Sequence, residues 1–421
     1  MGGININKNN IVIFCDKIIE IFIYALIFCL PFSKAAVEIS AGFIIIAWIV
    51  KRAFSSGAAW RFKPVSTYLN IPIIIYILAN FLSVIFSSRF ILSLKNFGTK
   101  TMEYIMLYFI VCEFVADRRR LKNTVIFMLV SAAMISVDCI FQYFFGFDFL
   151  RLREMEAQRI TASFQMPGDL AGYLGPLLCL SLSLCFLKFR KEIKYFLRIE
   201  SILLLGLLIA TLARGAWIGF IVALFFLSII ENRKILYFTI AFLFISGVIA
   251  SQFIKIPGDI LGYLKSIFML SADANLYRGE IWGAALEMIR DRPLFGHGLT
   301  TFMSVYPKYG KDYYFLNLGL IPYAHNCYLQ IAAETGIVGL ITFLWLIGKF
   351  FFYSIASLKK RIKDKFYHAV LSGISAGIIV TLVHSAVDTN LYSLQLSVLF
   401  WFMLGLNAAL QRNSLFKKAE D

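Results

Sequence analysis

IESILLLGLLIATLARGAWIGFIVALFFLSII, residues 199–230, contains two apolar runs that meet at a single arginine, Arg214. The hydrocarbon core of a bilayer is about 30 Å thick, and a helix needs roughly 20 apolar residues to cross it. The runs 199–213 and 215–230 are somewhat shorter, and tilting or local thinning of the bilayer accommodates such lengths. We therefore predict two membrane-spanning helices joined by a turn at Arg214 and Gly215.

Ten other stretches of the chain are apolar over similar lengths. Apolar residues make up 60% of the chain and charged residues only 16%, a composition that a soluble domain of 421 residues could not solvate. The stretches lack the alternation over ~10 residues that is typical of membrane β-strands. The sequence predicts an all-α polytopic membrane protein with about 12 transmembrane helices, forming a single integral membrane domain over residues 1–421. The other predicted spans are 14–32, 36–50, 69–87, 101–116, 123–145, 170–187, 235–254, 326–353, 367–387 and 391–410.

Basic residues give the chain a net charge of +16. In a soluble protein this charge would suggest nucleic-acid binding, but here the basic groups lie in alternate gaps between apolar spans, as in cytoplasmic loops. We therefore expect no nucleic-acid partner. The same rule places both termini in the cytoplasm and residues 255–324 on the opposite side. The basic groups lie near residues 51–63, 118–122, 188–198, 233–234, 359–365 and 412–418.

Residues 255–324 form the largest predicted loop, between the ninth and tenth spans. Residues 276–289 of this loop have helical periodicity, with Asp273 as the expected cap and Pro293 as the stop. We expect this helix to lie on the outer membrane face or to dip into it. The aromatic stretch 306–315 follows, and its rings suit either carbohydrate binding or an interfacial position.

Two arginines on the outer side run against the orientation bias. Arg214 lies at the outer end of two spans, where an arginine is costly unless it is paired or hydrated. It either extends to the interface or directs its guanidinium at a phosphate, whose oxygens suit its planar fork. Arg278, early in the loop helix, either forms a surface ion pair or has the same phosphate-binding role.

His325 lies where the long loop re-enters the membrane. A helix N-terminus disfavours positive charge, so we expect a neutral imidazole, which can take a proton from a hydroxyl. The alternative is a capping or interfacial histidine. Glu334 follows about half a turn out of phase on a regular helix and should not face the same pocket. Gly336 and Gly339 indicate close helix packing.

The remaining histidines and the cysteines carry weaker signals. His384 and Asp388 are four residues apart at the end of a span and fit a structural pair on a helix. We expect His297 in a turn and His368 on the cytoplasmic side. Cysteines without CxxC spacing and outer loops without an Asp-x-Asp motif predict no metal site and no cofactor.

Four segments together resemble a known family. With the twelve-span layout and the large outer loop, they resemble the O-antigen ligase and polymerase superfamily of bacterial membrane glycosyltransferases. The segments are Leu212–Trp217, Tyr277–Gly298, Ala324–Gly339 and, more loosely, Arg159–Leu174. In the last segment the family usually has a glycine and an asparagine where this chain has Ala162 and Asp169.

The resemblance implies a metal-independent glycosyltransferase of the GT-C type in the bacterial inner membrane, with its active site facing the periplasm. Its donor would be a polysaccharide on undecaprenyl pyrophosphate. The lipid tail of this donor would enter laterally between spans from the surrounding membrane lipid. In ligases of the family the acceptor is a sugar of the lipid A–core oligosaccharide. By the same resemblance His325, Arg214 and Arg278 take catalytic positions, and we assign substrate binding to Arg159, Asn326 and Asp388.

Three functions remain open at this level. A ligase is the first, and a polymerase that joins lipid-linked repeat units is the second. The length of the chain disfavours the protein-glycosylating branch of the superfamily. A flippase or transporter is the third, and it would show charged or broken helices near the midplane. The conspicuous charges of this chain lie instead at the predicted outer surface, which favours the two enzymes.

Overall fold

The computed structural model describes residues 8–55, 65–156, 159–231, 237, 272–310, 323–360 and 364–412. Over these residues the chain is helical, and its extended pairing is limited to two isolated bridges in the segment 147–159. The prediction of an all-α protein is confirmed. Except for Tyr237, the predicted span 235–254 lies outside the described residues, as do residues 255–271 and 311–322 of the long loop.

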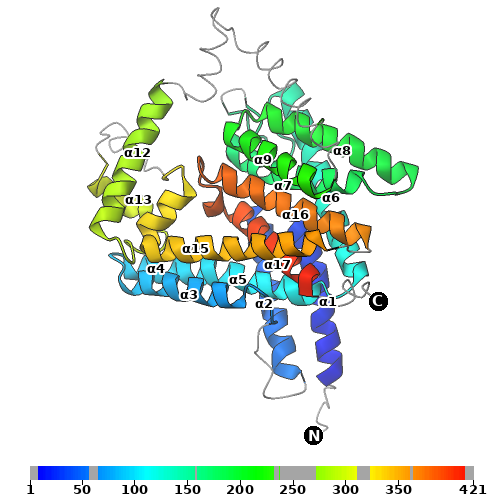
Figure 1. The fold of residues 1–421 in the computed structure, drawn as a ribbon, viewed down its shortest axis with the longest axis horizontal. Helices are drawn as coiled ribbons and strands as arrows, with labels where there is room; N and C mark the ends of the chain where they lie inside the picture. The colour runs from blue at the N-terminus through cyan, green and yellow to red at the C-terminus, as the bar shows by residue number, and fades with distance from the viewer. Residues whose placement is uncertain are drawn as a thin grey trace, which may run out of the picture.

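Twelve longer helices and several short ones make up the described part of the chain (Figure 1). The longer helices are α1 (Lys8–Cys29), α2 (Lys34–Phe54), α3 (Asn70–Ile85), α5 (Glu103–Phe114), α6 (Arg118–Phe145), α7 (Pro167–Cys185), α8 (Lys191–Ala210), α9 (Arg214–Ile230), α12 (Ala272–Asp291), α15 (Cys327–Lys359), α16 (Lys365–His384) and α17 (Leu394–Arg412). The short helices are α4 (Phe90–Asn96), the π-helix η2 (Phe97–Met102), α13 (Phe302–Val305), η3 (Tyr306–Lys308) and η4 (Asn390–Tyr392).

The described helices have the character of membrane spans. Five of them are long and apolar enough to cross a bilayer by length and composition alone: α6, α7, α15, α16 and α17. Two shorter apolar helices, α3 and α9, accompany them. The α1–α2 hairpin extends below the other helices in Figure 1, and α16 packs between α7 and α9. These observations show a helical membrane protein.

One predicted span has a different start. The sequence predicts residues 101–116, but the helical segment begins at Phe90 and reaches α5 through η2. Polar residues around Gly98 interrupt the apolar pattern, so hydropathy places the start too late. A π-turn inserts one extra residue per turn, and such turns occur often at functional sites.

The helix ends sort into two groups. Lys51 at the end of α2 forms an ion pair with Glu113 of α5 (3.0 Å), and Arg118 of α6 pairs with Asp364 before α16. We call this the basic end of the bundle. At the opposite end Lys34 donates to Gln165 (2.8 Å), and we call this the loop end. The grouping agrees with the alternation of helix directions that the basic residues predict.

A break in α15 fastens the long loop to the bundle. Gly336 has φ 70° and ψ −178°, which interrupts the helix. Backbone groups near the break form hydrogen bonds with the segment after α12: Ile337 N donates to Pro293 O (2.8 Å), and His297 N donates to Ala333 O (3.1 Å). The sequence predicts close helix packing at Gly336 and Gly339. In the structure Gly336 packs against Leu294 of the loop rather than against a helix, and Gly339 lies against the side chain of Thr335.

Replacing Gly336 with alanine should lower the thermal stability of the purified protein. A Cβ atom there would lie 2.1 Å from Leu294 O, and the φ of +70° is itself costly for an L-residue. We expect a loss of about 1–3 kcal/mol, measured as a lower melting temperature in detergent. Gly348→Ala is the matched control, because nothing lies within 4 Å of a Cβ at that position. Equal melting temperatures for the two variants would contradict this account of the break.

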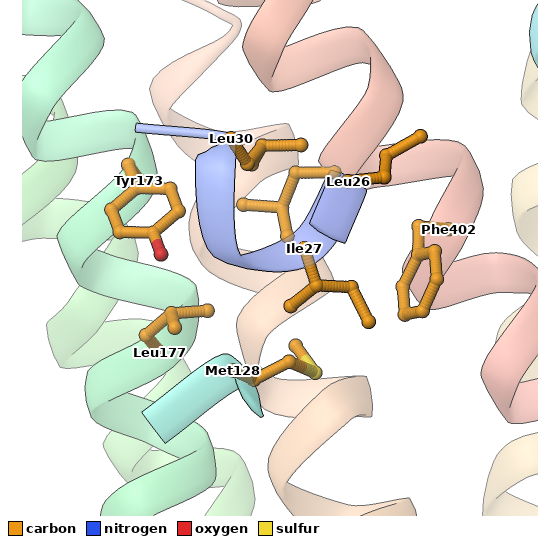
Figure 2. A pocket seen from close by; sticks show the side chains of 8 residues that line it. Leu26, Ile27, Leu30, Met128, Tyr173, Leu177 and Phe402 are labelled. Carbon is orange, nitrogen blue, oxygen red and sulfur yellow. The ribbon is translucent and has the colours of Figure 1, made fainter. Parts of the chain in front are cut away.

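A small apolar cavity lies between α1, α6, α7 and α17 (Figure 2). Its one polar lining group, the hydroxyl of Tyr173, donates to Ser131 Oγ (2.9 Å). The cavity therefore offers packing space and no reactive group. Its lining residues are Leu26, Ile27, Leu30, Met128, Tyr173, Leu177, Leu399 and Phe402.

Candidate active site

Arg159 lies in the connection between α6 and α7, which folds back onto α6. The buried side chain of Gln142 holds this connection, because its Oε1 accepts from the backbone N–H groups of Thr161 and Ala162 (both 2.8 Å). Arg159 Nε in turn donates to Thr211 O (2.8 Å) at the end of α8. The guanidinium is thereby brought to the turn that carries Arg214.

Arg214 is the first residue of α9, and a tight turn presents it. Leu212, just before it, has φ 54°, in the left-handed region that L-residues rarely adopt. The residue after Arg214 must be small, because a Cβ on Gly215 would lie 2.3 Å from Val387 Cγ2 and 3.0 Å from His384 Cδ2. The start of α9 therefore packs directly on the end of α16, with Arg214 exposed beside it.

Arg278 lies on α12, the predicted loop helix. The predicted apolar face of this helix is confirmed, since Ile281, Ala285 and Met288 are fully buried. The described helix runs from Ala272 to Asp291, so Asp273 lies within it and is not its cap. Trp282 Nε1 donates to Ala324 O (2.9 Å), which fixes α12 next to the residue that precedes His325.

His325 and Asn326 begin α15. Asn326 is the N-cap, and its Oδ1 accepts from Tyr328 N (2.9 Å) and Leu329 N (3.0 Å). Its predicted contact with substrate stays a prediction, in addition to this capping role. His325 has φ 46°, so the chain turns sharply just before the cap. Its imidazole is half-buried, and Nδ1 lies 3.8 Å from Asp388 Oδ1.

Asp388 joins the two histidines of the loop end. Its Oδ1 faces His325, and its Oδ2 lies 3.5 Å from His384 Nε2. The predicted pair of His384 and Asp388 is thus confirmed, but it is part of a larger group. Burial alone would raise the pKa of Asp388, but the neighbouring rings of His325 and His384 and a hydrogen bond from Thr389 N hold it well below the ordinary value. Asp388 is therefore a carboxylate at any physiological pH.

The predicted arginines and Asp388 are close enough for their charges to interact. Burial lowers the pKa of Arg278, Asp388 raises it, and the positive charge of Arg214 lowers it. Burial likewise lowers the pKa of Arg159, whereas Glu156 and Asp388 raise it and the positive charge of Arg214 lowers it. The structure thus brings Arg159, Arg214 and Arg278 around one carboxylate. Three guanidinium groups in one place suit an anionic ligand, because each can bind phosphate oxygens through two hydrogen bonds.

Several residues have roles that their sequence positions did not reveal. Glu334 is fully buried and accepts from Thr300 N (2.8 Å) and Tyr392 OH (3.1 Å). It therefore braces the long loop, in agreement with the expectation that it would not serve the pocket of His325. His297 is more than a turn residue: its buried ring contacts Met288 O (3.1 Å), and burial lowers its pKa.

The aromatic stretch of the long loop is described only in part. Tyr306 is fully buried and belongs to the packing of the loop, whereas residues 311–315 lie outside the described part of the chain. Gly168 at the start of α7 also borders the site, although no sequence motif marks it. A Cβ there would lie 2.4 Å from Asp388 Oδ2. Within the described ranges, no group of three or more His, Cys, Asp or Glu side chains could hold a metal ion.

Fold and site together define a helical membrane protein with an arginine-rich polar site at one end of the bundle. Part of the chain matches a known family: residues 200–344 match the model of the O-antigen ligase family. This segment contains Arg214, Arg278 and His325, whereas Arg159 and Asp388 lie outside it. The resemblance to the O-antigen ligase superfamily is therefore confirmed.

Two curated proteins are similar to the chain over about the same length. The O-antigen ligase of Pseudomonas aeruginosa is 31% identical over 144 residues, which are 34% of this chain and 30% of that protein. An uncharacterized protein of Haemophilus influenzae is 31% identical over 164 residues, covering 35% of this chain and 40% of that protein. The matches thus span less than half the length of either relative.

Proposed function

We propose that the protein is an O-antigen ligase, which transfers a polysaccharide from undecaprenyl pyrophosphate to a sugar hydroxyl of the lipid A–core. The observation that carries the proposal is the grouping of Arg159, Arg214 and Arg278 around the pair of His325 and Asp388. The match of residues 200–344 to the O-antigen ligase family supports it. We place the loop end of the bundle at the periplasmic face of the inner membrane.

The proposed reaction is a direct displacement at the anomeric carbon. The acceptor oxygen forms the new glycosidic bond as the bond from the anomeric carbon to the diphosphate oxygen breaks. The electron pair leaves with the undecaprenyl pyrophosphate, and the acceptor proton passes to His325. A single displacement inverts the anomeric centre and needs no nucleophilic carboxylate from the protein.

The arginines are suited to the charge that develops on the leaving group. A guanidinium binds phosphate oxygens through two parallel hydrogen bonds, and such charge-assisted bonds are stronger than neutral ones. Preorganised cations stabilise the transition state most where the charge increases during the reaction. We propose that Arg214 and Arg278 hold the diphosphate and that Arg159, bonded to Thr211, supports the same anion.

We propose that His325 is the base of this reaction. The tautomer with its proton on Nδ1 directs that N–H towards Asp388, 3.8 Å away, and leaves Nε2 free of hydrogen. The carboxylate then stabilises the imidazolium that forms when Nε2 takes the acceptor proton. Such contacts are often long without substrate and shorten when it binds.

A deletion strain would distinguish the ligase from a polymerase of the same superfamily. Loss of a ligase leaves lipid A–core without long chains, while the polysaccharide accumulates on its lipid carrier. We expect this pattern on gels of extracted lipopolysaccharide, with restoration by the wild-type gene. Core that carries single repeat units would instead indicate a polymerase. Normal lipopolysaccharide in the deletion strain would reject both enzymes and favour a transporter or another role.

A further inference from the structure

His384 is the member of the loop-end group that the proposed reaction does not use. It is the last residue of α16, and its side chain is buried, with 3% exposed. Its Nε2 lies 3.5 Å from Asp388 Oδ2, whereas Nδ1 is buried and has no hydrogen-bond partner among the residues that the structure describes. Over the described part of the chain, Asp388 is therefore the acceptor that this ring faces.

The surroundings of the ring show which nitrogen serves Asp388. Nε2 faces the carboxylate, so an N–H on this nitrogen can donate to Oδ2. A Cβ atom on Gly215 would lie 3.0 Å from His384 Cδ2, so the start of α9 packs closely against this side of the ring.

The charged groups near His384 come from three elements. Asp388 lies on the turn that follows α16, and Asp169 of α7 is also near the ring. Arg214 begins α9, whose second residue, Gly215, packs closely against His384. His325 faces the other oxygen of Asp388. Each carboxylate oxygen of Asp388 is therefore directed at a different imidazole.

We propose that His384 is a positioning residue for the transfer reaction: it donates from Nε2 to Asp388, and thereby aims that carboxylate at His325 and moderates its negative charge. This inference rests on the proposed function. Without the donor, Asp388 would keep more of its charge for His325 and would stabilise the imidazolium before substrate binds. His325 would then be protonated, and unable to act as a base, up to a higher pH.

Two amide variants of matched polarity test this inference. The side-chain nitrogen of His384→Gln reaches the position of Nε2 and can still donate to Asp388, whereas that of His384→Asn falls short of it. We expect the Gln variant to keep the wild-type dependence of transfer rate on pH. In the Asn variant the acid limb of the profile should move to higher pH, so the transfer rate falls most at acidic pH, by up to about tenfold for a shift of one unit, and recovers at alkaline pH.

The outcomes are separable when purified variants are compared with wild type on one lipid-linked donor and one lipid A–core acceptor. An equal loss at every pH in both variants would show a purely structural histidine and overturn the inference. Unchanged profiles in both variants would overturn it as well. Both results leave the ligase proposal intact, because wild-type protein still transfers. Absence of transfer by wild type itself would reject the proposed function and the inference together.

Discussion

The His325→Ala variant should lose transfer of polysaccharide to lipid A–core, by about 10²–10⁴-fold in rate, the range expected when a general base is removed. The imidazole is the group that can accept the acceptor proton beside Asp388, 3.8 Å from its carboxylate. Alanine offers no proton acceptor, so the hydroxyl would have to attack while still protonated. The measurement is the rate of lipopolysaccharide formation by purified protein under saturating donor and acceptor.

His368→Gln is the matched control for this variant. His368 pairs with Glu231 (2.9 Å) at the basic end, remote from the proposed reaction, so its replacement should leave transfer unchanged. Melting temperatures of both variants would confirm that each is folded. A His325→Ala variant that is folded and transfers at the wild-type rate would remove the base from the proposed mechanism.

The Arg214→Lys and Arg278→Lys variants should be impaired nearly as severely as the corresponding alanine variants. Lysine keeps the positive charge but loses the planar fork that binds two phosphate oxygens at once. We expect a loss of about 10²–10³-fold, comparable with the removal of one donor that stabilises a developing negative charge. The rate of transfer at saturating donor measures this effect.

Arg292→Lys serves as the control for the arginine variants. Arg292 also lies on the long loop, and its guanidinium donates to Phe86 O (2.9 Å) at an exposed position. A change at this residue should alter transfer little. Full activity in both Arg214→Lys and Arg278→Lys would mean that the two residues act as simple charges or not at all.

Much of the helical architecture could be predicted because apolar length is a local property of the sequence. The loop helix was also predictable, since one face of residues 276–289 is apolar and this face is buried against α13, η3 and the start of α15. The fourth span was predicted to start too late because hydropathy depends on local composition. Polar residues near Gly98 conceal a π-turn that continues the helix.

The site was predictable as a set of residues but not as an arrangement. Spacing on a single helix paired His384 with Asp388, yet the contact of Asp388 with His325 joins the end of α16 to the start of α15. Sharp backbone turns make such contacts between segments, with positive φ at Ala162, Leu212 and His325. Left-handed residues of this kind cluster at functional sites, and no hydropathy pattern encodes them.

Ala162 shows how the structure explains a departure from the family pattern. The family usually has glycine at this position, and the φ of 46° at Ala162 is one that glycine adopts without cost. The chain tolerates alanine here because Gln142 holds the turn by two hydrogen bonds, one of them to Ala162 N. Ala162 thus adopts a backbone conformation that would suit a glycine at this position.

The most direct test of the account is transfer by the purified protein in proteoliposomes. The reaction would contain undecaprenyl-pyrophosphate polysaccharide, lipid A–core and a chelator of divalent cations, without nucleotide. The account predicts that polysaccharide joins to lipid A–core with an inverted anomeric linkage, and that a variant with alanine at Arg214, Arg278 and His325 makes none. Lack of product from the wild-type protein, or equal product from the triple variant, would contradict it.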